Sequence, residues 1–161
     1  ATHAALTGHL VFSTLHTNDA AGAIARLIDM GIEPFLISSS IAGVLAQRLV
    51  RVVCQKCKEE INATDAMLED LRIERRENMK FYKGKGCPKC RDEGYTGRTG
   101  IYELLTIDET IKKLIIAKAS ADKIKQEALK AGMRTLRDDG IEKALAGITS
   151  VEEVLRVTRE E

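Results

Sequence analysis

The sequence predicts an α/β protein, and three observations lead to that class. Residues 1–53 contain strand-like and helix-like stretches in the order strand, helix, helix, strand. Residues 54–100 contain all four cysteines, arranged as two C-x-x-C pairs. Residues 101–161 have the apolar periodicity of short amphipathic helices. We therefore expect an α/β segment, a small tetracysteine subdomain and a C-terminal helical subdomain, in that order.

The first expected element is a buried strand at residues 10–15. This run is apolar, contains β-branched and aromatic residues, and is bounded by Gly8 and by a Thr-Asn-Asp turn. Asn18 or Asp19 is expected to cap the helix that follows, and Gly31 to end it.

A second helix is expected to begin at Pro34 and to carry an apolar stripe as far as Leu49. Residues 50–53 then predict another strand that leads into the first cysteine. Because two strands cannot close a sheet, we expect the remaining strands upstream of Ala1.

Four short helices with one shared core are expected in residues 101–161. Thr106 with Glu109, and Ser150 with Glu153, match the capping box, in which a hydroxyl and a carboxylate each satisfy a free backbone N–H. The expected core positions are Ile111, Leu114, Ile115, Ile124, Leu129, Leu136, Ile141, Leu145, Val151, Val154 and Leu155.

The cysteine spacing favours a metal site. Two residues between cysteines let both sulfurs of a pair reach one ion, and two such pairs provide the four-thiolate shell of structural zinc sites. A closed shell has no position for water, so the zinc would not be catalytic. The expected zinc ligands are Cys54, Cys57, Cys87 and Cys90.

Twenty-nine residues separate the two cysteine pairs, a length that the slow growth of loop-closure entropy tolerates, and Thr64 is expected to begin a helix there. A thioredoxin-type redox pair and unligated cysteines are the alternatives, although redox chemistry needs no second pair. Five cations near the sulfurs would offset the charge of a four-thiolate zinc site: Lys56, Lys58, Lys85, Lys89 and Arg91.

Composition narrows the function classes. The formal net charge is +1, which argues against a protein whose main function is to bind nucleic acid. Aromatic residues make up only 4%, so the core must be aliphatic. The sequence contains no apolar run long enough to span a membrane and no pattern typical of a secretory signal.

Two histidines, His9 and His16, bracket the expected strand. Such a strand would separate their rings by more than roughly 20 Å, too far for a shared metal or a catalytic pair. Ligands of open α/β sheets bind beyond the carboxyl ends of the strands. His16 is therefore the better candidate to meet a phosphate or its attacking water, with Thr14, Thr17 and Asn18 as nearby donors. A purely structural histidine is the alternative.

Taken together, these motifs resemble the secretion ATPases of type II secretion and type IV pilus assembly. Residues 7–20 (TGHLVFSTLHTNDA) are similar to the histidine box of this family, and residues 23–51 to the stretch that follows it. The paired C-x-x-C motifs resemble the zinc-bearing subdomain of its secretion and pilus-assembly members, which retraction motors lack. Residues 94–105 and 132–161 resemble its C-terminal end.

The resemblance implies a fold. Residues 1–53 would be the C-terminal part of a RecA-like P-loop NTPase core, residues 54–100 the zinc subdomain and residues 101–161 the helical subdomain. The P-loop, the Asp box and the acidic Walker B segment, which hold phosphates and Mg²⁺, are absent from these 161 residues. Ala1 is thus expected to lie just after Walker B. The intact parent would bind ATP and Mg²⁺, and this fragment alone would be inactive.

The resemblance also implies partners and roles. The parent would be a homohexameric, cytoplasmic motor, peripheral at the inner membrane, which converts ATP hydrolysis into pilin or pseudopilin assembly. Its partners would be the other subunits, the inner-membrane platform protein and the assembly machinery. His16 would sense or polarise the γ-phosphate region, with His9 in support. Arg26 and Arg48 would contact nucleotide or a neighbouring subunit, unless they form helix-surface ion pairs.

Two alternatives come from other function classes. A free-standing zinc ribbon could bind nucleic acid, but the only aromatics near the cysteines are Phe81, Tyr82 and Tyr95. A zinc knot with attached helices could also serve as a non-enzymatic interaction scaffold. A P-loop in the upstream sequence would distinguish the motor from the scaffold.

Overall fold

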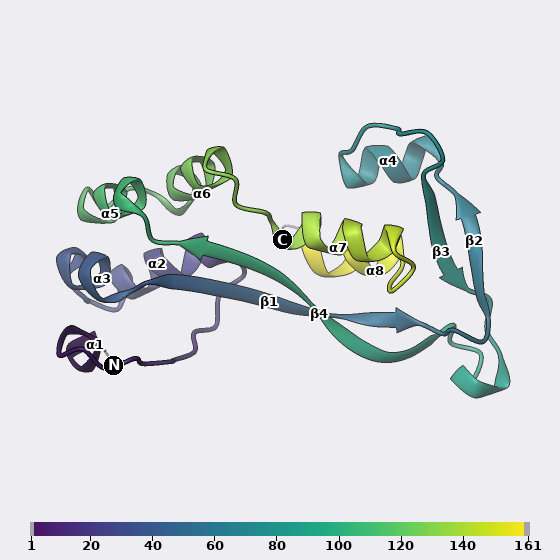
Figure 1. Cartoon of the computed structure of the whole chain (residues 1–161), viewed down its shortest axis with the longest axis horizontal. Coiled ribbons are helices and arrows are strands. Elements are labelled where there is room, and N and C mark those ends of the chain that lie inside the picture. The colour runs from purple at the N-terminus through teal and green to yellow at the C-terminus, as the bar shows by residue number, and fades with distance from the viewer. Residues whose placement is uncertain (1, 160–161) are drawn as a thin grey trace. The chain divides into compact units, whose positions relative to one another are not determined.

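The computed structural model describes residues 2–159 and has a mixed α/β architecture, as Figure 1 shows. This class is the predicted one. The described residues fall into two compact units, and each unit joins two separate stretches of chain: residues 2–46 with 103–134, and residues 47–102 with 135–159. The elements in chain order are α1 (Thr2–Leu6), α2 (Ala20–Asp29), α3 (Pro34–Ser40), β1 (Gly43–Val53), β2 (Lys58–Asn62), α4 (Asp65–Leu71), β3 (Lys80–Gly84), η1 (the 3-10 turn Pro88–Cys90), β4 (Tyr95–Thr106), α5 (Glu109–Ile116), α6 (Ala121–Lys130), α7 (Leu136–Leu145) and α8 (Val151–Thr158).

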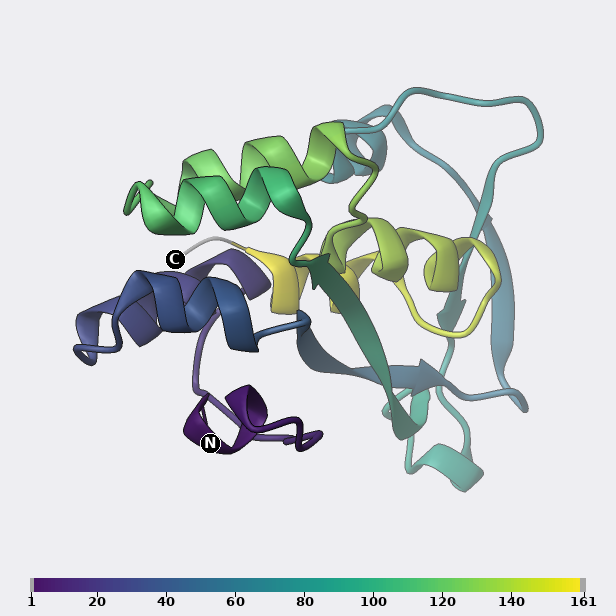
Figure 2. The same ribbon diagram turned by 60° about the vertical axis from the view of Figure 1, so that its left-hand side comes forward.

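The first unit has an aliphatic core between four helices. Helix α3 packs against α5, and α2 against α6. Figure 2 shows α5 and α6 side by side, with α2 and α3 beneath them. The buried residues of this core are Ala20, Ala21, Ile24, Ile37, Leu105, Ile107, Ile111, Ile115, Ile124 and Ala128.

Helix α2 confirms the predicted cap and stop. The Asp19 side chain accepts a hydrogen bond from the Gly22 N–H at 2.8 Å, which satisfies one of the free donors in the first turn. The helix ends at Asp29, and Gly31 follows with φ +84°, a conformation that glycine adopts without strain.

Helix α3 begins at Pro34 as predicted, but the expectation that it continues to Leu49 was wrong. The helix ends at Ser40, and the apolar stripe continues as strand β1. Three consecutive serines explain the stop, because the hydroxyls of Ser38, Ser39 and Ser40 donate to backbone carbonyls of the preceding turn. From there on, exposed and partly buried residues alternate along β1, which is the period of a strand.

The expected buried strand at residues 10–15 was also wrong. Residues 9–17 are irregular, and the side chains of Leu10 and Phe12 are 84% and 89% exposed. A strand needs a neighbour to pair its backbone N–H and C=O groups. Within residues 2–159 the only strand pairs are β1 with β4 and β2 with β3, so this segment has no such neighbour.

The second unit is built around the strand pair β2–β3 and three helices. The two strands are antiparallel, with Lys58 opposite Gly84 and Asn62 opposite Lys80. Helix α7 packs against α8 and against β3, and α4 packs against α8. The buried residues of this core are Ala63, Leu68, Leu71, Phe81, Ile141, Ala144, Val151 and Val154.

The single core expected for residues 101–161 is not formed. The described core of α5 and α6 belongs to the first unit, whereas that of α7 and α8 belongs to the second. One predicted cap was wrong as well, because Asp108 and not Thr106 accepts from the first turn of α5, at the Ile111 N–H. The three-part division at residues 53 and 100 stays a prediction.

The insertion between the cysteine pairs contains the predicted helix. Thr64 accepts a hydrogen bond from the Met67 N–H, and α4 then buries Leu68 and Leu71. The five residues from Glu74 to Asn78, which lead from α4 towards β3, are all exposed. None of the helices within residues 2–159 combines the length and the apolar character that a membrane crossing requires.

Candidate metal centre

The four cysteines belong to the second unit. They lie beside one end of the β1–β4 pair and one end of the β2–β3 pair. Cys54 directly follows β1, and Cys57 directly precedes β2. The Cys54 N–H donates to the Gly94 carbonyl at 2.9 Å, beside the end of the β1–β4 pair. The Lys85 N–H donates to the Cys57 carbonyl at 3.0 Å, which extends the β2–β3 pair. Backbone pairing therefore brings both C-x-x-C loops together.

The sulfur positions fit one tetrahedral ion. The four Sγ atoms all lie within 4.8 Å of one another. The Sγ–Sγ distances are 3.9 Å for Cys54–Cys87, 3.8 Å for Cys57–Cys90 and 3.7 Å for Cys87–Cys90. A tetrahedron with zinc–sulfur bonds of about 2.3 Å has sulfur–sulfur edges of about 3.8 Å. These separations are far longer than a disulfide bond of about 2.05 Å, so the cysteines are free thiols in a metal-like arrangement.

Backbone N–H groups favour negative charge on one of the sulfurs. Burial raises the pKa of the Cys90 thiol, but N–H groups of Gly94 and Cys87 that donate to its Sγ outweigh this effect and lower the pKa to about 7. Burial and hydrogen bonds with the other three thiols raise the pKa of Cys57 to about 12, against the lowering effect of the Gly86 backbone N–H. Four thiols thus share one small volume, and a divalent cation would relieve the cost of ionising the group.

Close backbone contact holds the second cysteine loop in place. A Cβ atom on Gly84 would lie 1.9 Å from the Gly94 carbonyl oxygen, so the two backbones can meet only as glycines. After η1, Arg91 and Asp92 both adopt left-handed φ angles of 53° and 62°, a conformation that non-glycine residues rarely take. The loop is therefore a tight, sterically defined turn.

Two members of the predicted cationic shell contact groups other than the sulfurs. Lys58 donates to the Gly147 carbonyl at 3.3 Å and lies 4.9 Å from the centroid of the Tyr82 ring. Lys85 forms an ion pair with Glu59 at 3.2 Å. Two of the five expected cations thus have other partners nearby.

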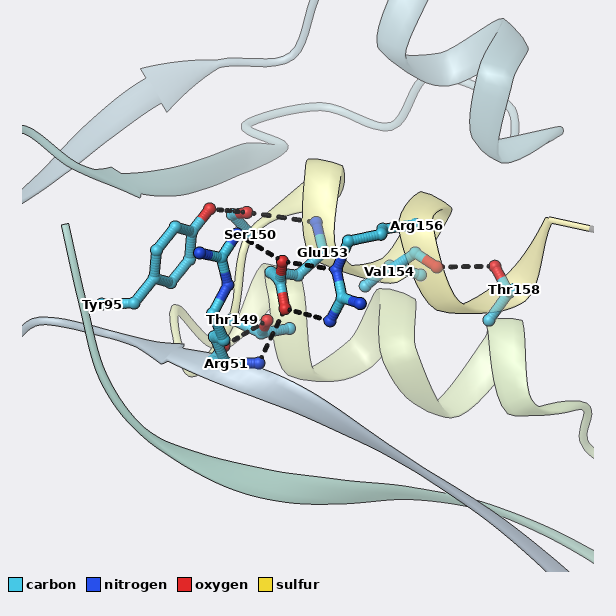
Figure 3. A network of polar contacts seen from close by, with 8 residues as sticks. All are labelled: Arg51, Tyr95, Thr149, Ser150, Glu153, Val154, Arg156 and Thr158. Atoms are coloured by element: carbon cyan, nitrogen blue, oxygen red, sulfur yellow. Dashed lines mark hydrogen bonds and ion pairs between the residues drawn. The ribbon is translucent and has the colours of Figure 1, made fainter. Parts of the chain in front are cut away.

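A polar network beside the cysteines was not foreseen from the sequence, and Figure 3 shows it from close by. Glu153, on α8, is 1% exposed. Its carboxylate accepts from the Arg51 backbone N–H at 2.9 Å and from Arg51 Nη2 at 2.7 Å. The Arg156 side chain donates to the same carboxylate through Nε and Nη2, each at 2.9 Å. A buried carboxylate is thus fully paired.

The charges of this network reinforce each other. Burial by itself raises the pKa of Glu153, but hydrogen bonds from Arg156 and Arg51 outweigh burial and hold the pKa at about 2. Hydrogen bonding to Glu153 in turn raises the pKa of both arginines above the ordinary value. The Arg51 Cζ lies 4.2 Å from the centroid of the Tyr95 ring, a cation–π arrangement.

The predicted nucleotide-contact residues between His9 and Asn18 lie in the first unit. His9, Thr14 and His16 are exposed on the irregular segment, and His9 Nδ1 lies 3.1 Å from the Thr7 hydroxyl. Because this segment is not a strand, the predicted separation of the two histidines no longer holds. Thr17 is partly buried and donates to the Asp19 carbonyl at 3.1 Å. The roles proposed for these residues stay predictions.

The start of α2, just after His16, is already occupied by carboxylates. Glu103 is 2% exposed and accepts from the Ala20 N–H at 2.9 Å, while Asp19 accepts from Gly22 and pairs with Lys125 at 2.9 Å. Burial raises the pKa of Asp19, but Lys125 and the Gly22 N–H outweigh it and lower the pKa below its usual range. Two negative groups at this helix end disfavour a phosphate there.

Comparison with known proteins decides the family. A family model described as "Type II/IV secretion system protein" matches residues 1–156. The chain belongs to this family.

Relatives in the type II/IV secretion system family are similar along essentially the whole chain. The "Type II secretion system ATPase E" of Vibrio cholerae is 52% identical over 160 residues, which cover 99% of this chain and 32% of that protein. The "Type IV pilus assembly ATPase PilB" of Thermus thermophilus is 54% identical over 162 residues, which cover 99% of this chain and 18% of that protein. The chain thus spans at most about a third of the length of these relatives.

Arg26 and Arg48, the other family residues expected at a nucleotide or subunit contact, lie on different elements. Arg26 is exposed on α2, and Arg48 is partly buried on β1. They belong to different units of the chain, and the roles expected for them stay predictions.

Proposed function

We propose that this chain is the C-terminal part of a hexameric motor ATPase that powers assembly of a type II secretion pseudopilus or a type IV pilus. The observation that carries this proposal is identity of 52–54% over nearly the whole chain to ATPases of both machineries. In the proposed parent, residues 1–53 complete a RecA-like core. The P-loop and Walker B, which these 161 residues lack, supply ATP and Mg²⁺ binding.

The enzymatic part of the proposal is tested by comparing two proteins. The 161-residue chain alone should show no magnesium-dependent ATP hydrolysis, because catalysis of phosphoryl transfer depends on groups that cradle the phosphates and the metal. The longer parent, carrying its P-loop, should hydrolyse ATP. Magnesium-dependent turnover by the chain alone, or an inactive parent, would contradict the proposal.

The histidines are tested in the parent. We propose that His16 senses or polarises the γ-phosphate region and that His9 supports it. His16→Ala should then lower turnover more than His9→Ala does, while ATP binding measured at equilibrium changes little. Equal turnover in the His16→Ala variant and the wild type would exclude His16 from this role. Arg26→Ala and Arg48→Ala, measured for turnover and hexamer formation, test the proposed nucleotide or subunit contacts.

The cysteine quartet is proposed to hold one structural zinc ion. Zinc, when bound, supplies a cross-link with no open coordination position, so the residues contribute stiffness and not chemistry. Support comes from the sulfur–sulfur distances of 3.7–3.9 Å. Metal analysis of freshly reduced, chelator-free chain should find about one zinc per chain, the stoichiometry of a single four-thiolate site. A value near zero, or iron in place of zinc, would refute the assignment.

The tetracysteine region is also the proposed contact with the inner-membrane platform protein. Lys83, Lys85 and Lys89 are exposed beside the cysteine loops, where they could meet an acidic surface. Charge reversal at these three lysines should weaken binding of the parent to the platform protein. Unchanged binding would refute this proposed contact. The competing possibility is that the zinc region only stiffens its own chain.

Nucleic-acid binding is the second candidate function, and a filter assay separates it cheaply. The net charge of +1 predicts no salt-dependent affinity for DNA or RNA. Binding that is tight at low salt and falls steeply at high salt would favour the zinc-ribbon alternative.

A further inference from the structure

The segment between α7 and α8 contacts two strands that flank the cysteine loops, β1 and β4. The Val53 N–H, one residue before Cys54, donates to the Ile148 carbonyl at 2.9 Å. The fully buried Thr149 donates through its hydroxyl to the Arg51 carbonyl at 2.8 Å. Arg51 and Val53, at the end of β1, are thus held by the segment between α7 and α8.

Strand β4 is also held by the segment between α7 and α8, through Ser150. The hydroxyl of Tyr95, the first residue of β4, lies 2.7 Å from the Ser150 Oγ. Ser150 is fully buried and also accepts from the Glu153 N–H at 3.4 Å, so it caps α8 and anchors Tyr95 at once. The Tyr95 ring in turn covers the Arg51 guanidinium.

Glu153 connects these contacts, as Figure 3 shows. One buried carboxylate binds both the backbone and the side chain of Arg51, and Arg51 stacks on Tyr95. Arg51 lies three residues before Cys54, and Tyr95 lies five residues after Cys90. A single side chain on α8 is therefore connected, through Arg51 and Tyr95, to the end of β1 before the first cysteine loop and to the start of β4 after the second.

We infer that Glu153 is a positioning residue for the tetracysteine site, acting through Arg51 and Tyr95 on the geometry of its four sulfurs. This inference rests on the metal site proposed above. It adds to that site a residue of α8, which follows Arg51 by 102 positions.

The energetics favour positioning over simple stabilisation. A buried ion pair adds little stability compared with apolar side chains of similar volume, but it fixes one arrangement, and loss of one partner leaves the others unpaired. Without the Glu153 charge, the repulsion between Arg51 and Arg156 would no longer be offset, and the hydrogen bonds from Arg51 would lose their ionic partner. Groups beyond the direct ligands commonly change metal affinity by about 10–100-fold.

The test uses the 161-residue chain loaded with zinc or with cobalt(II), and three variants. Glu153→Gln removes the charge at nearly constant volume. Tyr95→Phe removes only the hydroxyl that contacts Ser150. Glu152→Gln is the matched control, since Glu152 is the exposed neighbour on the same turn of α8.

Two readouts separate geometry from stability. The first is the rate at which zinc passes to a chromogenic chelator under native conditions. Glu153→Gln should release zinc at least about tenfold faster than the control, with Tyr95→Phe between them. The second is the absorption spectrum of the fully cobalt-saturated site, which reports the arrangement of the sulfurs and which loss of stability alone would not alter. Both the d–d bands and the sulfur-to-cobalt band should change in Glu153→Gln.

Each outcome decides. A wild-type chain that holds no zinc or cobalt would refute the metal site itself. A wild-type chain that holds metal, with unchanged release and spectra in Glu153→Gln and Tyr95→Phe, would refute only the positioning role. Faster release with an unchanged cobalt spectrum would mean lost stability and would also refute it. If circular dichroism shows that Glu153→Gln does not fold, the spectrum of Tyr95→Phe decides alone.

Discussion

The surroundings of Cys90 favour a thiolate. Two backbone N–H groups donate to its sulfur, and its pKa is lowered to about 7. The thiolate is the form of cysteine that binds metal. The four sulfurs together would form the tetrahedron around one metal ion, so loss of Cys90 opens the shell.

Cys90→Ser should therefore lose the metal. A hydroxyl is a poor ligand for zinc, and three remaining thiolates would bind it far more weakly. Metal analysis after dialysis should find the zinc content near zero in this variant. Gln55→Ala, an exposed change inside the first cysteine loop, is the control and should keep the wild-type content. Full zinc retention by Cys90→Ser would show that the quartet is not the ligand set.

Glu153 predicts a distinct dependence of stability on acid pH. Its pKa in the folded chain is about 2, below the ordinary value of 4.5. The charged form is thus favoured by folding, so its contribution is complete above about pH 4.5 and is lost as the pH falls towards about 2. The free energy of unfolding of the wild type should fall through this window relative to that of Glu153→Gln.

Urea unfolding of both proteins across this pH range measures the difference. Both proteins are measured after the metal has been removed with a chelator, because the variant is expected to lose zinc more readily and subtraction would not cancel that difference. A wild-type minus variant difference that stays constant across the window would contradict the low pKa of Glu153.

For single residues, the sequence predicted contacts between near neighbours in the chain, but it did not predict contacts between distant residues. The C-x-x-C spacing predicted the quartet, because two residues between ligands suffice to define the geometry. Ser150 and Glu153 matched a capping box, and Ser150 does accept from the Glu153 N–H. The Glu153 carboxylate, however, binds arginines, one of them 102 positions away, and no local pattern contains that information.

Among the elements, α7 and α8 approach each other closely at a glycine. A Cβ on Gly140 would lie 2.8 Å from the Val154 Cγ1 atom, which is closer than side-chain carbons approach. Gly140 is buried on α7, and Val154 is fully buried on α8. The missing side chain therefore sets how near these helices come.

Gly140→Ala should destabilise the second unit despite its better helix propensity. Alanine gains up to about 1 kcal/mol in a helix interior, whereas overpacking a core costs about 1–3 kcal/mol. Denaturant unfolding should show the net loss. The same change in a Val154→Ala background should be neutral or stabilising, since the clashing methyl groups are gone. Equal effects in both backgrounds would mean that this contact does not limit the approach of the helices.

Element boundaries show why the sequence predicted α2 but not the end of α3. Asp19 and Gly31 are direct cap and stop signals, and both act as expected. The apolar residues from Leu36 to Leu49 fit a helical stripe, yet the chain changes to strand after Ser40. Hydroxyl groups that compete for backbone carbonyls, and pairing of β1 with β4, override that periodicity.

For the whole molecule, the two units differ in what holds them together. The first has an aliphatic core and no cysteine among its described residues, whereas the second combines a core with the cysteine quartet. The quartet closes the loop that contains β2, α4 and β3, and β3 packs on α7. Metal should therefore stabilise the second unit selectively.

Hydrogen exchange with and without a chelator measures this selectivity. Removal of the metal should increase amide exchange in β2, β3, α7 and α8, and leave α2, α5 and α6 nearly unchanged. The chelator in the presence of excess zinc is the control. An equal increase in both units would show that metal binding stabilises the chain as one cooperative body.

Residues 10–15 mark the limit of prediction at this scale. Their composition is that of a buried strand, and the structure leaves Leu10 and Phe12 exposed on an irregular segment. Composition describes what a segment can bury, but pairing requires a neighbouring strand. Within residues 2–159 the strands pair only with one another, so this segment has no such neighbour.

The exposed stretch from Glu74 to Asn78 has a practical use. It lies inside the long loop between the cysteine pairs, where each doubling of loop length adds only about 0.6 kcal/mol to the cost of closure. Asn78 already adopts a left-handed φ of 59°, as residues of tight turns do. A fluorophore or a short affinity tag attached here would report on the tetracysteine region of the folded protein while the sulfurs and the α8 contacts stay intact.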